Sequence, residues 1–198
     1  MSNPSDKKIS VSGGFCLLVL WFGMINGWKL LAAVLSAAAV HELGHWFVLK
    51  LLGGRGTALR VSVFGAEMRV AGRLSYGEEL AVVLAGPGVN ILCGIILALF
   101  EEPWMICAGV HLVLGCFNLL PIRPLDGGRA LFLVGSWGAG PAVGERLVRI
   151  VGGCTALTGA VFLLWLMCRS GGSLWLFPAM TGMLIVWGNE VCGKRDFL

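Results

Sequence analysis

Three ionisable side chains, His41, Glu42 and His45, interrupt an apolar stretch in the first quarter of the chain. Positions i and i+4 of a helix lie nearly one above the other, so both imidazoles can offer a nitrogen to the same metal ion. The carboxylate of Glu42 lies about 100° round the helix from His41, where it can reach a water molecule at the metal without binding the ion itself. This HExxH pattern predicts a zinc hydrolase, with two histidine ligands and a glutamate general base.

The apolar surroundings of the motif strengthen this interpretation. Charged and histidine side chains inside a membrane helix are costly and usually mark a functional site. The alternative is a polar cluster that only satisfies neighbouring helices. Gly44 lies between the two histidines, where glycine weakens a helix by about 1 kcal/mol relative to alanine. We therefore expect a substrate or a packed helix to need the space beside it.

A second polar stretch, residues 118–129 (NLLPIRPLDGGR), begins inside another apolar run. Its two prolines disfavour continuation of a helix, and its two glycines permit backbone conformations closed to other residues. The sequence thus predicts an irregular segment that is buried in protein or lines a wet cavity. A catalytic zinc usually has three protein ligands. Asp126 is the best-placed carboxylate to be the third, although aspartate in such a turn is more often a turn former.

Two further polar residues, Asn90 and His111, lie in apolar runs. Asn90 follows Ala-Gly-Pro-Gly-Val, where Pro87 frees a backbone carbonyl and the glycines allow close helix packing, so its amide can hydrogen-bond across helices. His111 is on the same helix face as Asn118 and is an alternative nitrogen ligand. A neutral histidine packed between helices is the commoner arrangement, and Asp126 is the stronger candidate.

The composition is that of an integral membrane protein. Of 198 residues, 57% are hydrophobic and 13% are charged, and the mean hydropathy is +0.85, which lies outside the range of soluble domains. We expect an α-helical fold with about six transmembrane helices, over residues 11–25, 30–52, 79–100, 104–120, 150–168 and 174–191. Seven cysteines without a CxxC pair argue against a disulfide framework or a cysteine zinc site.

The distribution of positive charge predicts the topology. With both termini in the cytosol, all of the 15 lysines and arginines except Lys29 and Arg169 fall on the cytosolic side. We therefore expect a multi-pass protein of the cell membrane with cytosolic ends. The net charge of +4 reports this topology, and no nucleic-acid partner is needed to explain it.

Apolar and polar residues alternate from Leu59 to Val70, between the second and third predicted spans. Period two predicts a strand, and Gly65 makes it either one kinked strand or a short hairpin at the membrane. An extended peptide substrate could pair with its edge. An interfacial loop packed against the helices is the alternative.

Three motifs together, HELGH at 41–45, AGPGVN at 85–90 and NLLPIRPLDGG at 118–128, resemble the site-2 protease family of intramembrane zinc metalloproteases. The resemblance extends over roughly residues 11–192. It implies one catalytic zinc ion, with metal ligands His41, His45 and Asp126 and general base Glu42, and it implies that Asn118 and Pro124 border the substrate cleft. We add Phe64 and Asn90 as candidate substrate contacts.

We expect a single membrane protease domain over residues 1–198, with core spans at about 30–129 and no PDZ or CBS domain. The layout is most similar to the stage IV sporulation protease branch, which releases a membrane-tethered sigma factor. The expected partners are the lipid bilayer, a membrane-tethered protein substrate and a membrane-protein regulator. A catalytically inactive scaffold and a metal transporter are the rival classes, and cleavage of a peptide bond separates all three.

Overall fold

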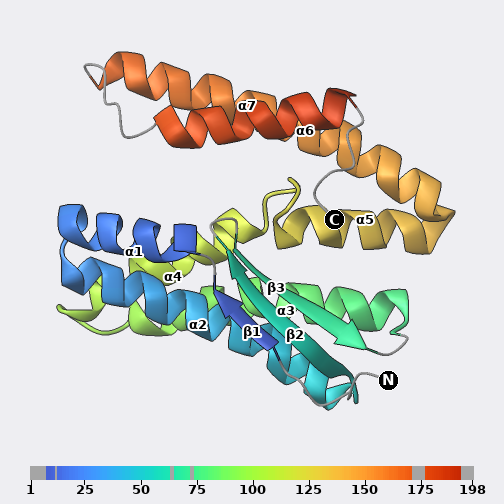
Figure 1. Cartoon of the computed structure of the whole chain (residues 1–198), viewed down its shortest axis with the longest axis horizontal. Coiled ribbons are helices and arrows are strands. Elements are labelled where there is room, and N and C mark those ends of the chain that lie inside the picture. The colour runs from blue at the N-terminus through green and yellow to red at the C-terminus, as the bar shows by residue number, and fades with distance from the viewer. Residues whose placement is uncertain (1–7, 12, 63–64, 72–73, 171–176, 193–198) are drawn as a thin grey trace. The chain divides into compact units, whose positions relative to one another are not determined.

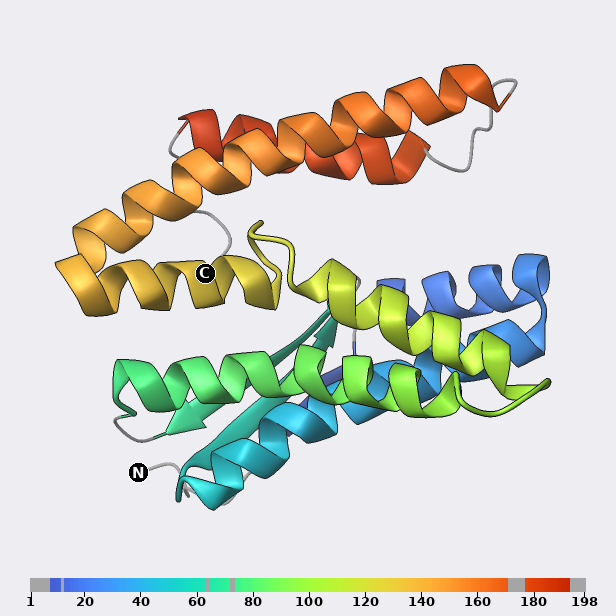
Figure 2. The ribbon, with the colours of Figure 1, turned by 180° about the vertical axis from the view of Figure 1, so that it is seen from behind.

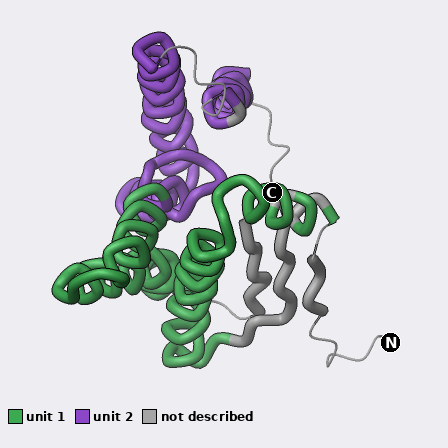
Figure 3. Tube along the Cα trace, turned by 90° about the vertical axis from the view of Figure 1, so that its left-hand side faces the viewer, with its two compact units in different colours: residues 1–117 green, residues 118–198 purple. Residues whose placement is uncertain are grey.

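The computed structural model of the chain describes residues 8–11, 13–62, 65–71, 74–170 and 177–192. These residues fold into seven helices and three strands. The chain divides into two compact units, which are residues 1–117 and residues 118–198 (Figure 3). In chain order the elements are β1 (Lys8–Val11), α1 (Gly13–Asn26), α2 (Trp28–Leu51), β2 (Arg55–Ser62), β3 (Gly65–Ala71), α3 (Tyr76–Leu97), α4 (Trp104–Asn118), α5 (Asp126–Ala139), α6 (Pro141–Arg169) and α7 (Phe177–Cys192).

Three of the described helices, α2, α3 and α6, are long and apolar enough to cross a membrane. At 1.5 Å per residue the 22 residues of α3 span about 33 Å, against a hydrocarbon core of about 30 Å. The 14 residues of α1 span only about 21 Å, and α4 is likewise a shorter apolar helix. The structure therefore supports a helical membrane protein, and the count of six spans stays a prediction.

The first unit is built on the packing of α3 against α2 and α4 (Figure 2). A Cβ atom at Gly44 of α2 would lie 2.8 Å from the carbonyl oxygen of Ala85 and 2.8 Å from Cγ1 of Val89. A Cβ atom at Gly115 of α4 would similarly lie 2.9 Å from Cγ1 of Ile91. Small residues thus let the backbones approach closely, as in other membrane helix pairs. The space beside Gly44 is taken by a packed helix, which is one of the two occupants that its position predicts.

The start of α3 is fixed by a capping box. The Ser75 hydroxyl accepts a hydrogen bond from the backbone N–H of Glu78, and the Glu78 carboxylate accepts one from the backbone N–H of Ser75. Such reciprocal bonds satisfy two N–H groups that a helix start otherwise leaves without intrahelical partners. The cap therefore fixes the residue at which α3 begins.

A three-stranded sheet in the order β1-β2-β3 belongs to the same unit (Figure 1). β2 and β3 pair antiparallel, with Ser62 opposite Gly65, in the segment whose alternating pattern predicts strands. β1 pairs parallel with β2, with Lys8 opposite Ala58, although residue 11 is the start of the first predicted span. Phe64 lies outside the described residues.

The second unit consists of α5, α6 and α7, with α6 packed against both of the others. The expectation of an irregular backbone at Gly127 and Gly128 is wrong, because both glycines lie in the first turn of α5. Their small size serves close packing instead: a Cβ atom at Gly128 would lie 2.7 Å from the carbonyl carbon and oxygen of Ile122. The preceding loop is tied to α6 by an ion pair of 2.8 Å between Arg123 and Glu145.

Candidate metal centre

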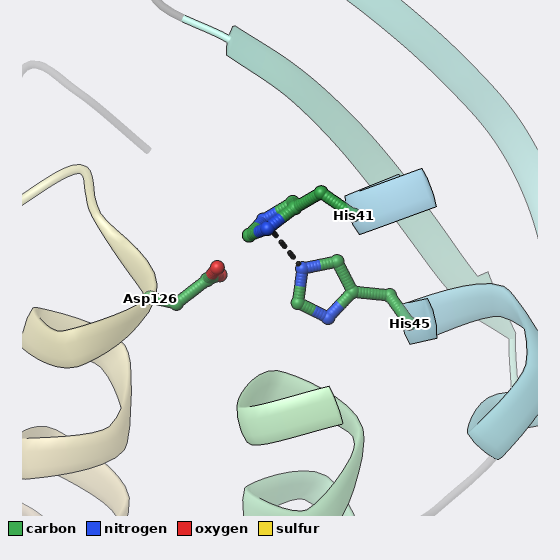
Figure 4. A group of neighbouring side chains, drawn as sticks. All are labelled: His41, His45 and Asp126. Atoms are coloured by element: carbon green, nitrogen blue, oxygen red, sulfur yellow. Dashed lines mark hydrogen bonds between the residues drawn. The ribbon is translucent and has the colours of Figure 1, made fainter. Parts of the chain in front are cut away.

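The two histidines of the HExxH motif lie one turn apart on α2 and direct their rings toward each other (Figure 4). The two Nε2 atoms are 3.1 Å apart, and the ring planes are nearly perpendicular at 85°. Two nitrogens bound to one tetrahedral zinc at about 2.0–2.1 Å would be roughly 3.3 Å apart. The observed separation therefore fits two ligands of one ion.

The tautomer of His45 is set by the backbone of α3. Its Nδ1 lies 2.7 Å from the carbonyl oxygen of Val82, and because a carbonyl can only accept, Nδ1 carries the proton. Nε2 then presents a lone pair toward His41. A zinc-binding histidine usually donates its other ring N–H to a backbone carbonyl or a carboxylate in this way.

The other histidine, His41, is buried at 6% exposure and reaches a polar pair deeper in the unit. Asn90 Nδ2 lies 3.4 Å from His41 Nδ1, and His111 Nδ1 lies 3.3 Å from Asn90 Oδ1. The Asn90 side chain is fully buried, between the helices. Its assignment as a substrate contact stays a prediction, and its observed partners are histidines.

Gly86 of α3 forms the surface against which the His45 ring packs. A Cβ atom at this position would collide with the imidazole, lying 2.6 Å from Cε1 and 2.9 Å from Cδ2. The sequence indicates only a close helix contact at this glycine. In the structure the close contact is to a candidate ligand, so Gly86 belongs to the site.

Four other predicted site residues lie on three helices and in one loop. Glu42 is half-buried and follows His41 on α2. In the second unit, Asn118 ends α4, Pro124 is exposed in the loop that follows, and Asp126 is the first residue of α5 (Figure 4). The first unit thus brings the two histidines together, and a carboxylate such as Asp126 would give the mixed nitrogen and oxygen donor set that zinc accepts.

Comparison with known families and proteins gives concordant matches. The family model described as Peptidase family M50 matches residues 98–166, a range that contains the 118–129 stretch. A zinc metalloprotease of Methanocaldococcus jannaschii is 28% identical over 162 residues, which are 75% of this chain and 48% of the relative. Stage IV sporulation protein FB of Bacillus subtilis is 30% identical over 130 residues, 61% of this chain and 45% of the relative. The chain thus spans about half the length of these relatives.

A solved structure, the site-2 protease from Methanocaldococcus jannaschii, has a similar fold. The TM-score is 0.65 at 23% sequence identity, and the match covers 96% of this chain and 92% of the other. At this identity the match establishes the fold alone.

Proposed function

Because the chain is a relative of peptidase family M50 and shares the fold of a site-2 protease, we propose that it is an intramembrane zinc metalloprotease. It would hydrolyse a peptide bond within or next to the membrane segment of a membrane-tethered protein. The observation that carries the proposal is the pair of histidine Nε2 atoms 3.1 Å apart on an apolar helix. A glutamate lies next to this pair in the sequence.

The proposed metal ligands are His41, His45 and Asp126. Their support is chemical, since two imidazoles and one carboxylate leave a fourth position open, as catalytic zinc sites require. When bound, zinc supplies a Lewis acid that polarises the scissile carbonyl and lowers the pKa of a water molecule toward about 7.

The chain's own residues would carry the proton transfers. Glu42 would take the proton of the attacking water and pass it to the nitrogen of the leaving amine, so that the peptide bond breaks with no net proton consumed. The side-chain amide of Asn118 would donate a hydrogen bond to the substrate carbonyl, while Pro124 and Phe64 would border the extended substrate. Removing a donor of the Asn118 kind typically slows turnover about a hundredfold or more.

A helical substrate must unwind before cleavage, because its peptide bonds are shielded by its own hydrogen-bond ladder. Strand addition to the sheet would replace the lost bonds. Of the two strands in the segment Leu59–Val70, β2 has a neighbour on each side, so we propose the outer edge of β3 for the substrate. The similarity to the sporulation protein makes a pro-sigma factor the first candidate substrate. We also propose that the chain crosses the membrane six times with both termini in the cytosol, and that a membrane protein regulates it.

Co-expression with membrane-tethered candidate substrates, a pro-sigma factor among them, tests the proposal. The native chain is compared with Glu42→Gln and with Glu101→Gln, which makes the same change at an exposed glutamate outside the helices. We expect Glu42→Gln to keep its zinc and to cleave about 10²- to 10⁴-fold more slowly, and Glu101→Gln to match the native chain.

Other results would contradict the proposal. Equal cleavage by Glu42→Gln and the native chain would refute the general base. A native chain that binds zinc but cleaves no substrate of the panel would favour the scaffold. Movement of zinc across vesicles that contain the purified chain would favour the transporter.

A further inference from the structure

A buried line of polar groups continues from the histidine pair into the helices of the first unit. It runs from His41 through the amide of Asn90 to His111, with exposures of 6%, 0% and 5%. We propose that Asn90 and His111 are positioning residues of the zinc site, which together select the tautomer in which His41 can bind the metal. This inference rests on the zinc site of the proposed function.

In the structure each contact of the line has one consistent donor. The Nδ2–H of Asn90 donates to His41 Nδ1, so the single proton of a neutral His41 is on Nε2 and donates to His45 Nε2. On the other side, His111 Nδ1–H donates to Asn90 Oδ1. With this amide orientation, the Nε2 of His41 carries a proton and cannot bind a metal.

Zinc binding requires the opposite arrangement at His41. Its proton must lie on Nδ1, and that N–H needs an acceptor. A half-turn of the Asn90 amide supplies one, because it exchanges Oδ1 and Nδ2, which occupy nearly the same space. Nδ2–H then faces His111 Nδ1, so His111 must accept there and carry its own proton on Nε2. No net proton is gained or lost, since each imidazole moves one proton between its two nitrogens.

Because the three side chains are buried, the turn of the Asn90 amide and the tautomer changes of His41 and His111 occur together. A buried N–H or acceptor without a partner costs far more than an exposed one, and two N–H groups facing each other across either contact would leave both without an acceptor. The orientation of the Asn90 amide therefore dictates the tautomers of both neighbouring histidines. His111 acts on the metal site through this amide, and it is not itself a ligand.

The first test is spectroscopic and uses the full chain in detergent. The protein has three histidines, all within this network, so ¹⁵N-histidine labelling gives a small set of signals, and His111→Asn identifies those of His111. On adding zinc after chelation, we expect His41 to change its protonated nitrogen from Nε2 to Nδ1 and His111 from Nδ1 to Nε2. His45 should keep its proton on Nδ1.

The outcomes separate this inference from the proposed function. A His111 whose tautomer is the same with and without bound zinc would overturn the inference while leaving the zinc site intact. Failure of the native chain to bind zinc, or binding that survives His41→Ala, would overturn the proposed metal centre itself.

The second test measures zinc affinity by competition with a chromogenic chelator. Asn90→Leu has about the same size without an acceptor, and we expect it to bind zinc about 10- to 100-fold more weakly. Asn90→Asp, whose carboxylate only accepts, should retain the native affinity. A merely structural polar contact would give no such rescue, so Asn90→Asp binding as weakly as Asn90→Leu would refute the role.

The role of His111 is tested by the same measurement of zinc affinity. His111→Leu should weaken zinc binding about tenfold, the lower end of the range for residues that hold a metal ligand in place. His111→Asn, whose amide places an acceptor near the position of Nδ1, should restore it. In the Asn90→Asp background no amide needs orienting, so His111→Leu should have no further effect there. An equal loss in both backgrounds would show that His111 acts by packing alone.

Discussion

A single methyl group at Gly86 should disable the metal centre without weakening the helix that carries it. Gly86→Ala places a Cβ atom 2.6 Å from Cε1 of His45. Alanine is favoured over glycine in a helix by about 1 kcal/mol, so helix propensity alone would make α3 more stable. The effect on the site and the effect on the helix therefore have opposite signs.

The size of the loss follows from the geometry of His45. Carbon atoms pack at about 3.5–4.0 Å, so the imidazole must retreat by roughly 1 Å. Metal sites tolerate deviations of only about 0.2 Å in ligand distance, and the hydrogen bond from Nδ1 to Val82, 2.7 Å long, resists the movement. A misplacement of about 1 Å costs on the order of a hundredfold. We expect at least that loss in both zinc affinity and cleavage.

Gly88→Ala is the matched control, because a Cβ atom there meets nothing within 4 Å. Both variants are purified in detergent and compared by zinc competition, thermal unfolding and cleavage of a membrane-tethered substrate. Gly88→Ala should equal the native chain in zinc affinity. If Gly86→Ala binds zinc as tightly as Gly88→Ala does, His45 is not held against α3 in the way described.

Two other substitutions test the elements that position the site. Gly128→Ala directs a Cβ atom into the backbone of Ile122 at 2.7 Å, whereas a Cβ atom at Gly138 meets nothing within 4 Å. We expect Gly128→Ala to weaken zinc binding, because it displaces the first turn of α5, and Gly138→Ala to leave it unchanged. Equal zinc affinities of the two variants would contradict a metal ligand on that turn. Ser75→Ala removes the cap of α3 and should lower the free energy of unfolding by about 1 kcal/mol, as measured by chemical denaturation. An unchanged midpoint of the denaturation curve would contradict this role of the cap.

The chemistry of the first unit could be predicted from the sequence because it depends on local spacing. Residues four apart on a helix share a face whatever surrounds them, so His41 and His45 had to be neighbours. Alternation between Leu59 and Val70 predicts strands for the same reason, since a pleated backbone points successive side chains to opposite faces.

The parts that could not be predicted depend on partners distant in the chain. β1 has only four residues, Lys8–Val11, and it is a strand because β2 lies beside it. The carbonyl of Val82 holds His45, and every residue has such a carbonyl, so no residue type marks this role. Glycine is ambiguous in a similar way, and only the structure distinguishes the close packing at Gly128 from the open turn that its neighbouring prolines suggest.

The polar side chains in the helices of the first unit are tolerated in an apolar sequence because they pair with one another. All three histidines of the chain belong to one network with Asn90, in helices whose other buried residues are mostly apolar or glycine. Polar side chains are expensive in such surroundings unless each finds a partner. Replacing one of these residues alone would leave its buried partner unsatisfied, whereas apolar residues at every position of the network would avoid the cost, so the network is better explained by the metal site than by the stability of the fold.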